Sequence, residues 1–375
     1  MKIAIVHEYL VQYGGAERVL EAIHELFPEA PVYTLLYDPD KMPDFYSKWD
    51  IRPSSLSKYK WINPHYKAFF YFYPYLIEQF DFRDFDLVIS CSYAYSHGII
   101  TSPDTLHITY CHTPMRFAWI QEEEYLSKIP LVARPIYRKM VNHLKKWDIQ
   151  ASKRPDYYIA SCQNVADRIQ RIYHRDSYII NPPINIDSFH LKESNKSYYL
   201  LVSRLVHPYK RIDLAIQAFN VNGLPLKIVG EGADRSFLEN SANKNIEFLG
   251  EKHGRELEEM YQNAKALIFP GEDDFGIVPI EANACGCPVI AYRKGGVMES
   301  QVEFKTALFF REPTPESLNK TISLHAQTQW VPSQIRENAL RFNKSIFMNN
   351  LSDFIKECNQ TYPLRKIHSH SGPLK

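Results

Sequence analysis

The stretch "YYLLVSRLVHPYKRIDLAIQAF", residues 198–219, contains the repeating element from which the whole chain is built. Its apolar run at 198–203 is too short for a helix and is typical of a buried strand. After a basic loop, apolar residues at helical spacing continue from Ile212 to Ala218. A buried strand followed by a helix is the unit of a parallel sheet with crossover helices, so this stretch predicts a doubly wound α/β fold.

The same alternation recurs along both halves of the chain. In the first half, we predict strands at 2–6, 32–37, 86–92, 107–112, 156–162 and 177–181. In the second half, we predict strands at 198–203, 226–230, 246–250, 266–270, 288–292 and 306–310. The polar segment NPPINIDSFHLKESNKS separates the halves without any periodicity, which indicates a linker with a hinge near 182–196. We therefore expect an N-terminal domain at 1–185, a C-terminal domain at 186–345, and a helix and tail at 346–375 that return toward the first domain.

Composition excludes several classes of protein. The 375 residues fit about two domains, and 44 basic against 43 acidic residues give no field that favours nucleic acid. The first apolar run ends at His7 and Glu8, too early for a signal peptide, and no run is long enough to span a membrane. Six cysteines show neither the density of a disulfide framework nor metal-binding spacing. These features predict a cytoplasmic protein.

Three glycine-containing or basic loops follow predicted strands, where a doubly wound sheet binds its ligands. Gly14 and Gly15 open a helix, either to let the backbone approach an anion or only to make a tight turn. Arg204 and Lys210 flank the end of the strand at 198–203, where a guanidinium and an ammonium suit a diphosphate. A group of basic residues is usually only a solvated loop, but the position at the carboxyl end of a strand counts against that interpretation here. Gly230 also follows a strand, but the third glycine of a dinucleotide fingerprint is absent.

The acidic stretch PGEDDFGIVPIEANACGCPVIAY, residues 270–292, allows three interpretations. Its carboxylates could bind a metal, act as paired catalytic acids, or accept hydrogen bonds from hydroxyl groups. Asp273 lies in a loop and Glu281 lies eight positions later in the following helix. Such separated carboxylates suit two hydrogen-bonding tasks better than one ion, and a carboxylate accepts well from the vicinal hydroxyls of a ribose.

Together, these stretches resemble the retaining nucleotide-sugar glycosyltransferases of the GT-B fold, specifically glycosyltransferase family four. The resemblance covers residues 1–355 and rests on HEYLVQYGGAERVLEAI, CHTPMRFAW, NPPINIDSF, VSRLVHPYKRIDLAI, EDDFGIVPIEANACGCPVIAY and KGGVMES. It implies two Rossmann-like domains facing each other across a cleft. The first domain would bind the acceptor and the second the sugar nucleotide.

The resemblance also implies roles for individual residues. Arg204 and Lys210 would hold the donor diphosphate, and Glu281 would bind the ribose. Asp273 would contact the donor sugar or assist at the reacting centre, although the family usually has a glutamate there. Backbone amides of the turn would face the sugar and phosphates; this turn comprises Phe275, Gly276, Ile277 and Val278.

His112, in CHTPMRFAW, would contact the donor sugar or leaving phosphate, whereas a lone histidine at a strand end is more often structural. The family's reaction proceeds with retention at the anomeric carbon, and we expect no metal or other cofactor. The HEYL and CHTPMRFAW variants look most like the subgroup that contains GDP-mannose-dependent mannosyltransferases. The leading expectation is therefore transfer of mannose from GDP-mannose to a saccharide or lipid-linked acceptor, in the synthesis of bacterial surface polysaccharide or lipopolysaccharide. The alternatives are a UDP-hexose or UDP-N-acetylhexosamine donor, a sugar-nucleotide epimerase, and a catalytically idle nucleotide-binding or scaffold protein.

The segment at 49–76 interleaves four basic residues with many aromatic residues. A basic aromatic surface can lie at a membrane interface, which would make the protein a peripheral one. The other interpretation is a helix on the acceptor side, buried against the first domain. More basic residues recur at 133–156, although most such runs are solvated helix faces.

Overall fold

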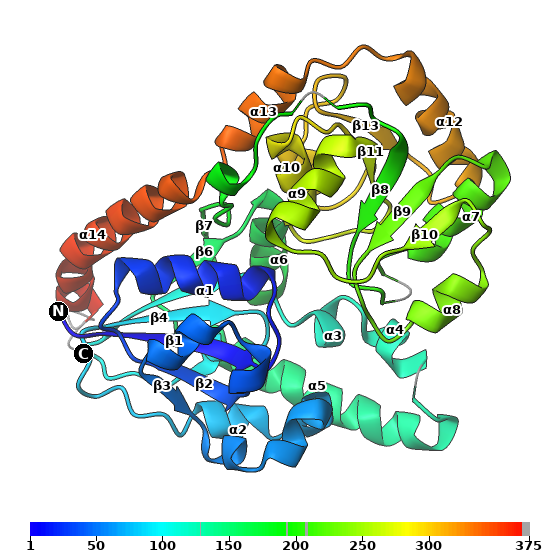
Figure 1. The fold of residues 1–375 in the computed structure, drawn as a ribbon. Helices are drawn as coiled ribbons and strands as arrows, with labels where there is room; N and C mark the ends of the chain where they lie inside the picture. The colour runs from blue at the N-terminus through cyan, green and yellow to red at the C-terminus, as the bar shows by residue number, and fades with distance from the viewer. Residues whose placement is uncertain (128, 193, 207–208, 370–375) are drawn as a thin grey trace. The chain divides into compact units, whose positions relative to one another are not determined.

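The computed structural model describes residues 1–127, 129–192, 194–206 and 209–369. The chain divides into two compact units (Figure 1). The first unit contains Met1–Asn181 and Phe347–Lys375, and the second contains Pro182–Ile346. Within the described residues, no helix is long and apolar enough to cross a membrane.

The first unit contains a seven-stranded parallel sheet in the order β3-β2-β1-β4-β5-β6-β7. The strands are β1 (Ile3–Leu10), β2 (Val32–Tyr37), β3 (Ile51–Pro53), β4 (Leu87–Ser92), β5 (Leu106–Cys111), β6 (Tyr157–Ala160) and β7 (Tyr178–Ile179). The helices are α1 (Gly15–Leu26), α2 (Tyr73–Ile77), α3 (Arg116–Trp119), α4 (Glu122–Ser127), α5 (Arg134–Ala151), α6 (Gln163–Tyr173) and, from Phe347 onward, the C-terminal α14 (Lys344–Ser369).

The second unit contains a six-stranded parallel sheet in the order β10-β9-β8-β11-β12-β13. The strands are β8 (Tyr198–Val202), β9 (Leu226–Val229), β10 (Ile246–Phe248), β11 (Ala264–Phe269), β12 (Val289–Tyr292) and β13 (Ala307–Phe310). The helices are α7 (Ile212–Asn222), α8 (Arg235–Asn240), α9 (Gly254–Asn263), α10 (Ile277–Ala284), α11 (Val297–Ser300), α12 (Pro315–Gln327) and α13 (Pro332–Leu340).

Both sheets have the Rossmann strand order. The order of the parallel strands reverses between β1 and β4 in the first unit and between β8 and β11 in the second. The predicted α/β class with two doubly wound sheets is therefore confirmed. Every predicted strand is present, and the short edge strand β3 was missed because its Ile-Arg-Pro sequence has no apolar run. The predicted end of β1 was wrong. Strand β1 continues through His7 and Glu8 to Leu10, because both polar side chains are buried with partners.

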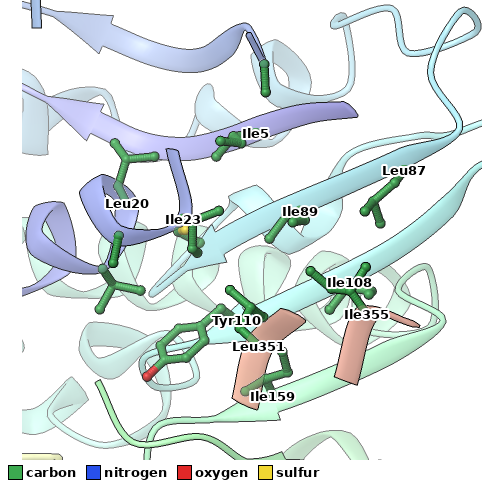
Figure 2. Close-up of a cluster of buried hydrophobic side chains, with 14 of the residues drawn as sticks. Ile5, Leu20, Ile23, Leu87, Ile89, Ile108, Tyr110, Ile159, Leu351 and Ile355 are labelled. Carbon is green, nitrogen blue, oxygen red and sulfur yellow. The ribbon is translucent and has the colours of Figure 1, made fainter. Parts of the chain in front are cut away.

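Helix α14 completes the core of the first unit although it is the last element of the chain. Leu351 and Ile355 pack against Ile108 and Ile159 on the sheet, together with residues of β1 and α1 (Figure 2). Burying one such aliphatic side chain contributes roughly 1.5–3 kcal/mol. The segment that closes this core therefore comes from the far end of the sequence.

Candidate active site

In the second unit, a lysine and an aspartate meet where the strand order reverses. Lys210 lies in the loop after β8, and Asp273 lies in the loop after the neighbouring strand β11. The Lys210 Nζ donates to both carboxylate oxygens of Asp273 at 2.7 Å. Both side chains are largely buried, with 16% and 20% of their surfaces exposed. The sheet thus brings together two charges that are 63 residues apart in sequence.

Glu281 occupies a separate position in α10, the helix that follows the Asp273 loop. Its side chain is buried, and its Oε2 accepts a hydrogen bond of 3.0 Å from the hydroxyl of Tyr261 on α9. The chain enters α10 through Gly276 at φ +87°, a conformation that favours glycine. Phe275 anchors this turn by packing its ring on Phe342, 5.6 Å between centroids.

The Asp273 loop rests on a second glycine loop. The backbone N–H of Gly296 donates to the Asp273 carbonyl at 3.0 Å. Gly295 has φ +77°, and a Cβ there would lie 2.4 Å from the same carbonyl oxygen. A side chain at this position would therefore displace the Asp273 backbone. These two glycines stand in the KGGVMES stretch and were not among the predicted site residues.

The other predicted residues of the second unit lie at strand ends or in the first turn of α10. Arg204 is exposed, two residues beyond the end of β8. Gly230 directly follows β9 at φ +135°, and a Cβ there would lie 1.9 Å from the carbonyl oxygen of Ser203. The chain's own packing is thus sufficient to require glycine at position 230. Ile277 and Val278 form the half-buried first turn of α10.

In the first unit, the glycine pair precedes α1, which begins at Gly15. Gly14 is extended, and a Cβ on it would lie 3.3 Å from the carboxylate of Glu17. That carboxylate approaches the Nε2 of His7 to 3.2 Å, with both side chains almost fully buried. The glycine pair therefore lies beside a buried polar pair at the start of α1.

His112 directly follows β5, and its backbone N–H donates to the carbonyl of Ser92 at 2.8 Å. Within the described residues, its buried Nε2 has no hydrogen-bond partner. Burial, with a smaller contribution from the charge of His7, lowers the pKa of His112 to about 3. The imidazole is therefore neutral near pH 7, and it is suited to hydrogen bonding rather than to pairing with a phosphate as a cation.

The loop beside His112 is held by a buried carboxylate that was not predicted from the sequence as part of the site. Glu8 is fully buried, and its Oε1 accepts from the backbone N–H groups of residues 93–96 at 2.8–3.1 Å. The hydroxyls of Ser92 and Ser96 also donate to it at 3.2 Å. The loop held in this way includes Tyr93, whose ring centroid lies 6.3 Å from that of His112. Glu8 thus fixes the loop that borders His112, and its position two residues after the apolar run at 2–6 was the available signal in the sequence.

Asp273 and Glu281, the two acids singled out in this stretch, have different partners. In the part of the chain that the structure describes, no group of three or more His, Cys, Asp or Glu side chains has the arrangement of a metal site. Asp273 instead faces Lys210, and Glu281 faces Tyr261. Of the three interpretations of this stretch, the two separate hydrogen-bonding positions describe the geometry best.

Two protein-family models match the chain, one on each unit. "Glycosyltransferase Family 4" matches residues 13–188, and "Glycosyl transferases group 1" matches residues 184–342. The chain belongs to the family-four, group 1 glycosyltransferases. The predicted family and enzyme class are therefore confirmed.

Three curated relatives are similar to this glycosyltransferase over part of its length. The glycosyltransferase MJ1178 of Methanocaldococcus jannaschii is 29% identical over 40% of this chain and 44% of its own length. A GDP-mannose-dependent alpha-mannosyltransferase of Mycobacterium tuberculosis is 36% identical over 28% of each chain. The O-antigen chain mannosyltransferase RfbU of Salmonella typhimurium is 31% identical over 37% of this chain and 42% of its own. The glycosyltransferase thus aligns with less than half the length of each of these relatives.

Solved structures share its fold along nearly the whole chain. Sucrose-phosphate synthase of Thermosynechococcus elongatus superposes with a TM-score of 0.71 at 14% identity, covering 96% of this chain and 100% of that one. Anabaena HepE in complex with UDP gives a TM-score of 0.68 at 14% identity, covering 95% and 100%. These similarities confirm the GT-B fold of this glycosyltransferase.

Proposed function

We propose that this chain transfers a hexosyl group, with retention, from a nucleotide sugar to a saccharide or lipid-linked acceptor. The observation that carries the proposal is the Lys210–Asp273 pair at the strand reversal of the second unit, with Glu281 in the helix that follows the Asp273 loop, in a member of this family. This is where a Rossmann-like sheet binds nucleotides. Our first candidate for the donor is GDP-mannose, since two of the relatives bear the names of mannosyltransferases. The O-antigen name of one supports a role in surface polysaccharide synthesis.

The donor-binding roles that we propose follow the chemistry of each side chain. Arg204 and Lys210 would bind the diphosphate, with the amides of Phe275, Gly276, Ile277 and Val278 at the start of α10. Glu281 would accept from the ribose hydroxyls while Tyr261 holds its other oxygen. Asp273 keeps Lys210 in place and would contact the donor sugar. We also propose that His112, as a neutral imidazole, and the turn at Gly14 and Gly15 contact the donor.

In the proposed reaction, the bond from the anomeric carbon to the diphosphate oxygen breaks as the acceptor oxygen attacks from the same face. The acceptor hydroxyl gives its proton to the departing phosphate oxygen. The positive charges of Lys210 and Arg204 stabilise the negative charge that develops on the leaving group, which is the largest catalytic contribution in many enzymes. These groups supply that charge stabilisation without a metal ion.

The test is a donor panel followed by product analysis. The protein is incubated with GDP-mannose, UDP-glucose and UDP-N-acetylglucosamine, and donor binding is measured by thermal shift. We expect GDP-mannose to stabilise the fold most. Stabilisation only by a UDP sugar would show that the donor is that UDP sugar and not GDP-mannose. Absence of binding to all three would contradict the proposal. Transferred sugar with the donor's own anomeric configuration, measured by NMR, supports retention, whereas a donor epimerised at another carbon would indicate an epimerase.

Two substitutions test the assigned site. Lys210→Ala and Glu281→Ala each remove a charged hydrogen-bonding group, which we expect to weaken donor binding by about 10- to 100-fold. Lys244→Ala, an exposed lysine elsewhere in the same unit, serves as the control. Wild-type donor affinity in both site variants would show that the donor binds elsewhere.

A further inference from the structure

The first unit carries a surface that combines basic and apolar side chains. Two segments of the chain, 51–77 and 125–147, contain ten basic residues and no acidic residue, although the whole chain is nearly balanced. The structure brings them into contact. The Phe70 and Tyr137 rings lie 5.8 Å apart, and those of Tyr71 and His143 lie 5.5 Å apart.

One face of α5 supplies much of the positive charge. A shallow hollow on this face is lined by Pro135, Arg138, Lys139, Asn142, His143 and Lys146. The opposite face, with Val141 and Leu144, is buried against the unit. Acidic residues of α4 partly compensate one flank, where Glu122 pairs with Lys145 and Glu123 lies 3.8 Å from Arg138. Among the described side chains, Lys139 and Lys146 make no such pair and remain exposed.

Large apolar side chains are exposed beside these charges. Val132 and Ile136, at the start of α5, are 89% and 65% exposed, and Leu131 next to them is 74% exposed. On the other segment, Trp61 is 64% exposed and its ring packs edge-on against Phe69. Exposed apolar residues in a group mark an interaction surface, because water contact with them is unfavourable.

We propose that this face docks on an anionic phospholipid surface. Lysine attracts acidic headgroups, aliphatic side chains enter the boundary of the acyl region, and tryptophan favours the headgroup level. An acidic protein or a nucleic acid would match the charges, but its charged groups would not account for the exposed apolar side chains of Leu131, Val132 and Ile136. This inference goes beyond the proposed glycosyl transfer and does not depend on it.

The experiment measures sedimentation of the full chain with vesicles, without donor or acceptor. We expect binding to vesicles of phosphatidylcholine with about 30% phosphatidylglycerol, weaker binding in high salt, and little binding to pure phosphatidylcholine. The Lys139→Ala/Lys146→Ala variant should bind roughly 25-fold more weakly, since each lysine near an acidic membrane contributes about fivefold. The control Lys244→Ala/Lys320→Ala removes two exposed lysines of the second unit and should bind as the wild type does.

A second measurement tests insertion of the apolar residues. Lipids brominated on the acyl chain should quench tryptophan fluorescence, and Trp61→Phe should remove most of the quenching. Val132→Ser should weaken vesicle binding several-fold, whereas Val221→Ser, at a valine of the second unit that is 80% exposed, should not. Absence of binding to anionic vesicles, or equal binding by the patch and control variants, would overturn the proposal. Donor affinity measured on the same variants should be unchanged, so failure here is distinguishable from failure of the transferase proposal.

Discussion

At the residue scale, the side chains that define the candidate site differ in how they are held. Lys210 and Asp273 hold each other at 2.7 Å, whereas Glu281 is held by the neutral hydroxyl of Tyr261. The first pair can rearrange around a ligand without leaving a buried charge alone, because both side chains retain some exposure. A diphosphate bound as we propose would therefore share Lys210 with Asp273.

Two substitutions test the charge and the length of the side chain at position 273. Asp273→Asn keeps the shape but removes the charge that pairs with Lys210, so we expect kcat/KM for transfer to fall by about 10- to 100-fold. Asp273→Glu keeps the negative charge and introduces the side chain that is usual in the family. We expect it to keep activity within about tenfold of the wild type. If the asparagine variant were as active as the wild type, the carboxylate would have no part in the reaction.

Glu8 is the residue whose role depends most on burial. Glu8→Gln replaces the carboxylate, whose Oε1 accepts from four backbone N–H groups, with a neutral amide that has only one acceptor oxygen, so several donors lose their charged partner. We expect the first unit to lose about 3–5 kcal/mol of unfolding free energy, measured by urea denaturation. Glu122→Gln breaks the partly exposed pair with Lys145 and should cost at most about 1 kcal/mol. Equal costs for the two variants would contradict the special role of Glu8.

At the element scale, loops at the carboxyl ends of strands build the site, and neighbouring loops support them. The Asp273 loop follows β11 and rests on the Gly295–Gly296 loop after β12. In the first unit, Glu8 of β1 holds the loop after β4, and Tyr93 of that loop lies beside His112. In both units, a neighbouring element thus supports a segment that carries or borders a proposed site residue.

Substitutions at two glycines distinguish the cost of backbone strain from the cost of steric crowding by a side chain. Gly295 and Gly223 have similar positive φ values, +77° and +67°, but a Cβ meets the Asp273 carbonyl at Gly295 and nothing within 4 Å at Gly223. Gly223→Ala should cost only the strain, about 1 kcal/mol, with unchanged donor affinity. Gly295→Ala should cost more and weaken donor binding about tenfold or more, because Asp273 must move. Thermal unfolding and donor titration of both variants provide the comparison, and unchanged donor affinity in Gly295→Ala would show that this loop does not position the site.

At the scale of the whole molecule, buried neutral histidines connect stability with pH. Burial lowers the pKa of His107 and His112 to about 3 and that of His325 to about 4. His107 and His112 belong to the first unit and His325 to the second. Each unit thus contains at least one imidazole that resists protonation when folded.

The sign of the pH effect follows from these shifts. Between pH 6.5 and the folded-state pKa, the unfolded chain binds a proton that the folded chain does not, so acidification favours unfolding. We expect the unfolding free energy to be insensitive to these groups above pH 7 and to fall below pH 6.5, by up to about 1.4 kcal/mol per pH unit for each histidine. Urea denaturation between pH 7.5 and 4.5 measures the slope, and His107→Asn should make the slope shallower. The same slope in this variant would show that His107 does not contribute to the pH dependence of the unfolding free energy.

The sequence by itself determined the two parallel sheets, because buried strands and crossover helices have distinct hydrophobic periods. It also identified Lys210, Asp273 and Glu281 as candidates, since each stands at a strand end or helix start. It did not show that Lys210 and Asp273 pair, because strand order, not sequence distance, makes β8 and β11 neighbours. Likewise, only the tertiary structure decided the role of Glu8, since a carboxylate inside an apolar strand is tolerable only where the fold supplies donors around it. The basic and aromatic segments were visible in the sequence, but their contact through α5 depends on the packing of side chains distant in the chain.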